Sequence, residues 1–137
     1  MPKVKALICA EGVSVDIATK QLSIFNILEQ IGAIQFPVMM GNLCVVGVVE
    51  KTAGDKNVYD GSVILKSNGK DIAQTAFKVD FKTGTMNRSI SKFQGIPIQS
   101  PGVLEICFGL DGKLIGNAKI EFALITQANI NSMSIDF

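Results

Sequence analysis

The chain has 137 residues, 47% of them hydrophobic, with 13 basic and 12 acidic side chains and no histidine. This length predicts a single domain over residues 1–137 with its core in residues 3–126. The charges are scattered, so no basic stripe for nucleic acid is present, and the lack of histidine removes the commonest general base and metal ligand. We therefore expect no cofactor, no nucleic-acid partner and no catalytic activity.

The first predicted strand runs from Lys3 to Glu11 and ends at Gly12. The apolar run inside it is too short for an export signal, which favours a cytoplasmic location. A short extended piece, residues 13–15, leads into a turn over residues 16–20. We expect the side chain of Asp16 to cap that turn through its carboxylate oxygens.

The stretch Gln21–Leu28 fits two structures. Ile24 and Ile27 fit one face of a helix, for which Ser23 is a possible N-cap. β-Branched and aromatic residues dominate, however, and Pro37 soon ends the apolar run. We therefore favour a strand and keep the helix as the alternative.

The stretch from Gln30 to Val49 carries no charged residue. Pro37 and a turn predicted at Met39–Asn42 interrupt it, which argues against a membrane span. We expect a loop that leads into a strand over Leu43–Val49, and the continuous apolar run predicts that this strand is buried on both faces.

Two hairpins are predicted in the second half of the chain, over residues 58–82 and 102–126. Each is expected to close on a three-residue loop with a G1 bulge, Ser67–Gly69 in the first and Leu110–Gly112 in the second. The glycine that ends each loop has positive φ in such a turn, so the structural glycines are Gly69 and Gly112. The expected cross-strand pairs are Val63–Ala73 and Tyr59–Phe77 in the first hairpin and Phe108–Leu114, Ile106–Gly116 and Leu104–Ala118 in the second.

A further strand is predicted over Arg88–Ile98, where Gly95 and Pro97 are typical of a sheet edge or a bulge. Together the segments make about eight strands at close spacing with turn residues between them. The predicted fold is all-β, a single-domain antiparallel β-sandwich or a flattened barrel with tight hairpins.

The C-terminal segment, residues 127–137, alternates again after the last hairpin. Met133, Ile135 and Phe137 are apolar and are separated by polar residues. An apolar strand is costly to leave in water, and the open edge of a sandwich can accept one. We therefore expect a homo-oligomer, most simply a dimer, with these three residues as interface candidates; a disordered tail is the alternative.

Two stretches resemble a known family. One is A-L-I-C-A-E-G-V-S-V-D-I-A-T-K-Q-L-S-I-F-N-I-L-E-Q-I followed by F-P, from Ala6 to Pro37, and the other is F-Q-G-I-P-I-Q-S-P-G-V-L-E-I-C-F-G-L-D-G-K-L-I, from Phe93 to Ile115. They are similar to small bacterial β-rich proteins catalogued as a domain of unknown function. The chain departs from that pattern at Thr19–Gln21, where a glycine is typical. The resemblance implies a cytoplasmic bacterial β-domain, and it brings no catalytic residues.

The candidate chemical groups are few. Cys9, Cys44 and Cys107 lie on three predicted strands without metal-ligand spacing, which favours free thiols in a reducing compartment. Cys107 has the polar parity of its strand, so we place it on an outer face and expect it to react faster than the other two, although an inert thiol remains the simpler interpretation.

Oxygen ligands for Ca²⁺ are offered by Asp55, Asn57 and Asp60, which share one loop and the start of a strand. Lys51 and Lys56 oppose such a site by their charge, and a solvated loop is the better interpretation. We expect a non-catalytic β-sandwich that acts through protein contacts as an assembly or interaction module. The alternative is a sandwich that binds a small ligand or Ca²⁺ through its end loops, and the sequence identifies no membrane partner.

Overall fold

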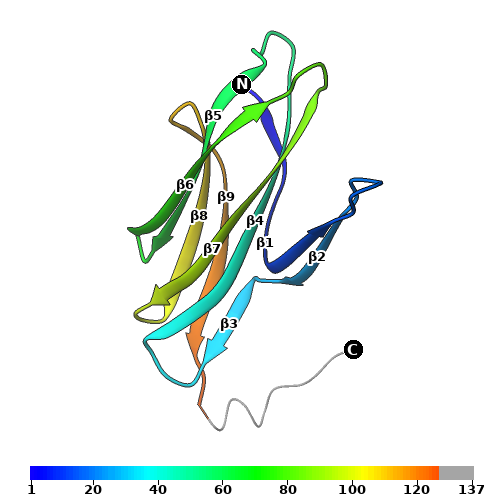
Figure 1. Ribbon diagram of the computed structural model, residues 1–137. Coiled ribbons are helices and arrows are strands. Elements are labelled where there is room, and N and C mark those ends of the chain that lie inside the picture. Colours follow the sequence, from blue (N-terminus) through cyan, green and yellow to red (C-terminus); the bar gives the residue numbers. More distant parts are fainter. Residues whose placement is uncertain (127–137) are drawn as a thin grey trace.

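The computed structural model describes residues 1–126, which form nine strands in two sheets (Figure 1). Alternation of apolar and polar residues, rich in Val, Ile and Phe, produces these strands because one side chain in two is buried between the sheets. The strands are β1 (Lys3–Val15), β2 (Leu22–Ile27), β3 (Gln30–Ala33), β4 (Val38–Glu50), β5 (Val58–Ser67), β6 (Lys70–Asp80), β7 (Met86–Ile98), β8 (Gly102–Leu110) and β9 (Lys113–Leu124).

The two sheets make a sandwich that is not closed into a barrel. Sheet A has the strand order β2-β1-β4-β7 and sheet B the order β3-β9-β8-β5-β6. All pairings are antiparallel except that of β3 with β9, which is parallel. The all-β fold is thus confirmed. The strand that was not predicted is the short β3, whose partner β9 lies some ninety residues away in the sequence.

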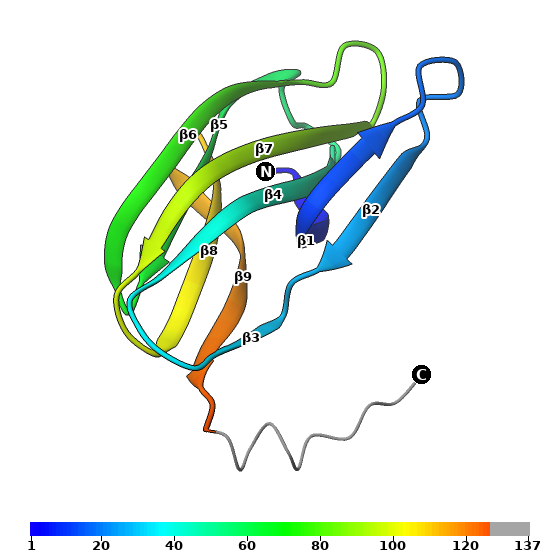
Figure 2. The same cartoon turned by 60° about the horizontal axis from the view of Figure 1, so that its bottom comes forward.

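Strands β2 and β3 form one edge segment that passes from sheet A to sheet B. Between them, the Leu28 amide donates to the Cys9 carbonyl at 2.7 Å, and the Glu121 amide donates to the Glu29 carbonyl at 3.0 Å. Figure 2 shows β3 running from the end of β2 toward β9. The segment Gln21–Leu28 is therefore a strand over Leu22–Ile27, as favoured, and the helical alternative is wrong.

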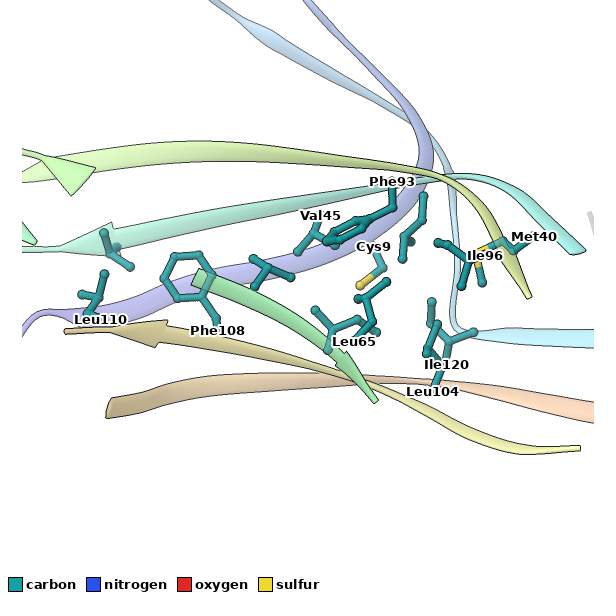
Figure 3. Packing of buried hydrophobic residues seen from close by; sticks show 14 of the residues in the cluster. Cys9, Met40, Val45, Leu65, Phe93, Ile96, Leu104, Phe108, Leu110 and Ile120 are labelled. Atoms are coloured by element: carbon teal, nitrogen blue, oxygen red, sulfur yellow. The ribbon is translucent and has the colours of Figure 1, made fainter. Parts of the chain in front are cut away.

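The core lies between the two sheets and is built from inward side chains of both (Figure 3). Phe108 and Leu65 of sheet B are at most 1% exposed, and Val45 and Leu43 of sheet A are equally buried. Figure 3 labels Phe108, Leu65 and Val45 together with seven further core residues: Cys9, Met40, Phe93, Ile96, Leu104, Leu110 and Ile120.

Strands β4 and β1 differ from two expectations about the first half of the chain. Met39–Asn42 is not a turn, because all four residues pair with or lie opposite β7 inside β4. Gly41 lies opposite Gly95, which has φ of 64°, and the register of β4 with β7 is the same on both sides of this position. Gly12 does not end β1 either, because it pairs with Phe25 of β2. The stretch Leu43–Val49 is buried on both faces, as predicted, apart from the half-buried Val48.

Both predicted three-residue loops are wrong, because each hairpin closes on a two-residue turn. Asn68 and Gly69 have φ of 49° and 85°, and Asp111 and Gly112 have φ of 49° and 78°. Two successive positive φ values define a type I′ turn, whose twist matches that of the strands. The positive φ predicted for the two glycines is confirmed.

The cross-strand register shifts accordingly. Each hairpin places its bulge within the strands, at Leu65/Lys66 and at Phe108/Gly109, and not in the turn. After a type I′ turn, these bulges place the apolar side chains of both strands on the same face of the sheet. Every expected pair is therefore displaced by two residues. The observed pairs are Val63–Thr75, Leu65–Ala73, Gly61–Phe77 and Tyr59–Val79 in the first hairpin and Phe108–Gly116, Ile106–Ala118 and Leu104–Ile120 in the second.

The described part of the chain, residues 1–126, contains no helix long and apolar enough to cross a membrane. The uncharged stretch Gln30–Val49 forms β3, a connection and most of β4.

Candidate functional site: an apolar outer sheet face

The outer side of sheet A is apolar at its centre. Cys9 pairs with Val45 and both point into the core, so their chain neighbours point outward by alternation. Outward Ala10 pairs with Cys44, and Ala10 is 0% exposed although residues 1–126 form no third layer over it. Larger side chains on the neighbouring strands therefore shield Ala10 and Cys44 from solvent.

The outward row along the middle of the sheet is made of aliphatic residues. Val46 is paired with Ile8 on one side and with Ile90 on the other, and it is 1% exposed. Both isoleucines are half-buried. Arg88 and Lys92 are the outward basic residues on β7, and they rim this row at the sheet edge. An apolar face with a charged rim is the pattern of an interaction surface.

Strand β2 adds the most exposed part of this face. Ile27 pairs with Ala10 and Phe25 pairs with Gly12, so both project on the outer side. Phe25 is 53% exposed and Ile27 is 55% exposed. We define the outer apolar face as the set Ile8, Ala10, Phe25, Ile27, Cys44, Val46 and Ile90.

The hairpin of β1 and β2 extends away from the body of the sandwich (Figures 1 and 2). Its turn is capped as predicted, because the amides of Ala18 and Thr19 donate to Oδ1 of Asp16 at 2.9 and 2.8 Å. The hydrogen bonds from Thr19 hold the pKa of Asp16 below its usual value. Arg88 donates to the Lys20 carbonyl at 3.1 Å and ties the hairpin to β7.

A second candidate is a cavity of about 320 Å³ at the end of the sandwich where β3 begins. Apolar side chains of Leu28, Ile31 and Met39 line it, together with the polar Glu11 and Asn42. Its volume lies at the lower end of small-ligand pockets, roughly 300–1,000 Å³.

The three calcium candidates each already contact a cation or a backbone donor. Asp55 contacts the amine of Met1 and accepts from the Thr52 amide at 2.7 Å. Lys51 contacts Asn57 Oδ1, and Lys78 contacts Asp60 Oδ1. Within residues 1–126 no three His, Cys, Asp or Glu side chains come together as a metal site. The geometry gives this cluster a role in holding loops together.

Cys9, Cys44 and Cys107 are all free and buried. Cys107 lies on the outer side of sheet B, as its parity predicted, but it is 8% exposed because it forms the floor of a pocket of about 210 Å³ with Ile64 and Leu114. Burial raises the pKa of Cys107, with a further contribution from Glu105, and burial raises that of Cys9 to about 11. Cys107 therefore lies on an outer face, as predicted, and is buried there by its neighbours.

The interface candidates Met133, Ile135 and Phe137 lie outside the described residues. Sequence reasoning missed Phe25 and Ile27 as surface residues, because their stretch was ambiguous between strand and helix. The available signal was the absence of any charge from residue 21 to residue 28, which is unusual for an edge strand.

Comparison with known proteins adds a family and a fold. A family model described as a family of unknown function, DUF6941, matches residues 5–123. No curated protein matches the chain. Among solved structures, the chain is similar to Pseudomonas fluorescens alkylpurine DNA glycosylase AlkC bound to DNA containing an abasic site analog, at 14% identity and a TM-score of 0.51. The match covers 88% of this chain and 30% of the glycosylase chain, and at this identity it shows the fold alone.

Proposed function

The chain belongs to the family of unknown function DUF6941, and from its surface we propose that it is a non-catalytic assembly module that acts by binding protein chains through the outer apolar face. The observation that carries the proposal is the exposure of Phe25 and Ile27, at 53% and 55%, beside a buried apolar floor. Burying the exposed halves of both side chains contributes on the order of 2 kcal/mol per copy.

The raised pKa values of two thiols also favour a role in protein contacts over a role in catalysis. A cysteine nucleophile needs a lowered pKa, whereas burial raises the pKa of both Cys9 and Cys107. The three cysteines in the described structure are free, which supports placement in a reducing compartment such as the cytoplasm. The family resemblance implies a bacterial source. We propose both the cytoplasmic location and the bacterial source.

The test is sedimentation of the full chain over a range of concentrations up to high micromolar. We expect a homo-oligomer, most simply a dimer, that the double variant Phe25→Ser/Ile27→Ser weakens. The matched control is Val58→Ser/Leu114→Ser, which removes two side chains that are 45% and 63% exposed and lie on sheet B. A full chain that stays monomeric at high micromolar concentration contradicts the proposal.

The segment 127–137 is proposed as a second contact, from its sequence alone. Met133→Ser/Ile135→Ser/Phe137→Ser removes the three interface candidates, and Asn129→Ser/Asn131→Ser is the control. Light scattering that shows the same mass for the apolar variant and the native chain removes the segment from the interface.

The second candidate function is small-ligand binding in the cavity lined by Leu28, Ile31 and Met39. Ligand that binds the native state raises the melting temperature. A thermal-shift screen with metabolites and divalent ions tests it, and Met40→Ala, which alters a lining residue, should weaken any shift. A screen that moves nothing favours the assembly function.

A further inference from the structure

The edges of the two sheets differ in how they are protected. A free strand edge can pair with another chain, and proteins commonly prevent this with charged residues or proline. β7 carries Arg88, Lys92 and Pro97, and β6 carries two lysines and two aspartates. The halves of β1 and β9 that have no edge partner, residues 3–9 and 113–120, carry two lysines each.

Strand β2 lacks this protection. Its sequence, L-S-I-F-N-I, contains no charged residue and no proline, and it forms the outer edge of sheet A. Among the four terminal strands of the two sheets that residues 1–126 form, only β3 is also uncharged; it has four residues, and β2 has six. Residues 38–43 of β4 are uncharged too and pair only with β7, but they lie inside the sheet and line the cavity beside β3. β2 is therefore the longest terminal strand that can accept a partner without burying a charge.

We propose that β2 pairs edge to edge with β2 of a second copy, antiparallel about a two-fold axis, so that sheet A continues from one protomer into the other. This inference rests on the proposed assembly function and names its partner and surface. It places four strands on each side of the axis in one continuous sheet.

The lack of charge argues for a second copy as the occupant. In a two-fold pair the same segment faces itself, so a charged strand opposes its own charge, and like charges across a strand pair are destabilising. β2 carries no charge along its whole length, so pairing with itself brings no like charges together. An acidic or basic partner strand finds no opposite charge on β2 to select it.

The side chains on the outer face support the same pairing. Phe25 and Ile27 lie on the outer face next to this edge and are half exposed. With the two-fold axis at Ile24, Phe25 of each copy faces Ser23 of the other, and the two Phe25 rings are diagonal neighbours on the outer face, close enough for aromatic rings to cover each other. Asn26, with φ of 56°, ends the regular extension, so Leu22–Phe25 supplies the regular part of the pairing.

The first test uses two serines that form a cross-strand pair. Ser23 lies on β2 and pairs with Ser14 on β1, and both are exposed on the same face. Ser23→Lys puts a charge on the edge, and we expect it to raise the dimer dissociation constant at least about tenfold. Ser14→Lys puts the same charge one strand inward and should change it far less. Circular dichroism and the melting temperature verify that both variants fold.

The second test is complementation in a mixture. Ser23→Lys and Ser23→Glu should each dimerise poorly alone, and an equimolar mixture should recover the dimer because opposite charges then meet across the axis. Hydrogen exchange provides a direct reading: amides of Leu22–Ile27 should exchange more slowly as the concentration of the native chain rises through the dissociation constant.

The outcomes separate the two proposals. A dimer that Phe25→Ser/Ile27→Ser weakens but Ser23→Lys leaves intact, with no recovery in the mixture and no concentration-dependent protection of β2, overturns the edge pairing and keeps the assembly module. A chain that does not self-associate at all overturns both.

Discussion

Gly47 of β4 lies against the aromatic ring of Phe108 of β8, across the interior of the sandwich. A Cβ atom added to Gly47 would lie 2.4 Å from Cε2 of the ring, and 3.0 Å from Cδ2. The ring thus occupies the space that any side chain at position 47 needs. The glycine sets how closely sheet A approaches sheet B at this point.

We predict that Gly47→Ala destabilises the protein by about 1–3 kcal/mol, because it overpacks a core that has no free volume at that point. The control is Gly41→Ala on the same strand, where an added Cβ has no neighbour within 4 Å. Denaturant unfolding measures both. The double variant Gly47→Ala/Phe108→Leu should recover part of the loss, and strict additivity of the two changes would show that the contact does not limit packing.

A second glycine and ring repeat this relationship within sheet B. Gly61 pairs with Phe77, and an added Cβ would lie 2.3 Å from Cε2 of that ring. The rings of Phe77 and Phe108 have centroids 5.8 Å apart. Two rings and two glycines therefore form one packed unit through both sheets.

The type I′ turn at Asp111–Gly112 gives the next prediction. Gly112 has φ of 78° and open space around it, so a substitution there changes backbone strain and no contact. Gly112→Ala should cost roughly 1 kcal/mol or more in unfolding free energy, since a Cβ disfavours this conformation. Gly12→Ala is the control, because Gly12 also has open space but no positive φ. Equal stability of the two variants would contradict the strain.

The hairpins show what local sequence can and cannot predict. Asn68-Gly69 and Asp111-Gly112 identify both turns and predict positive φ at the glycines. Register follows from both the turn and any bulge in the strands, and no residue type marks the bulge at Leu65/Lys66. The pairing therefore came out two residues away from the prediction, although the buried parity of Phe108 and Leu104 was right.

Elements that depend on distant partners were harder to predict. β3 has four residues and pairs in parallel with β9, so nothing in its own sequence identifies it as a strand. The outer apolar face is likewise assembled from strands distant in sequence, such as Ile8 of β1 and Ile90 of β7. Strand type was predictable from composition, whereas sheet order was not.

Asp55 makes stability depend on pH in the acid range. Hydrogen bonds from the amine of Met1 and from Thr52 lower the pKa of Asp55 from 3.8 to about 2. The ionised form is therefore favoured by folding, so its contribution is fully present above pH 4 and is lost as the pH falls toward 2. Asp55→Asn should lower the melting temperature at pH 6, and the difference from the native chain should shrink at pH 2.

The control for that series is Asp71→Asn, whose native carboxylate is 64% exposed and lies 3.8 Å from Lys66 Nζ. An exposed pair of this kind contributes little, so its removal should change the melting temperature only slightly. A constant difference between Asp55→Asn and the native chain from pH 6 to pH 2 would be inconsistent with the lowered pKa of Asp55.

The thiols give the last prediction. Cys9, Cys44 and Cys107 are 4%, 5% and 8% exposed, so a thiol reagent should label the native protein at pH 8 at least about a hundredfold more slowly than the denatured chain. Cys107 should react before Cys9, because it lies at the floor of a surface pocket, whereas Cys9 lies in the core. Mass spectrometry of the labelled peptides identifies the order.

Substitution of Glu105 separates its effect on the reactivity of Cys107 from the effect of burial. It raises the pKa of Cys107 by its charge and by a hydrogen bond, in addition to the larger effect of burial. Glu105→Gln removes the charge, so Cys107 should be labelled faster at a given pH and its rate profile should shift to lower pH. Glu121→Gln on the adjacent strand β9 is the matched control and should leave the rate at Cys107 unchanged. If Glu105→Gln and Glu121→Gln label alike, burial alone controls this thiol.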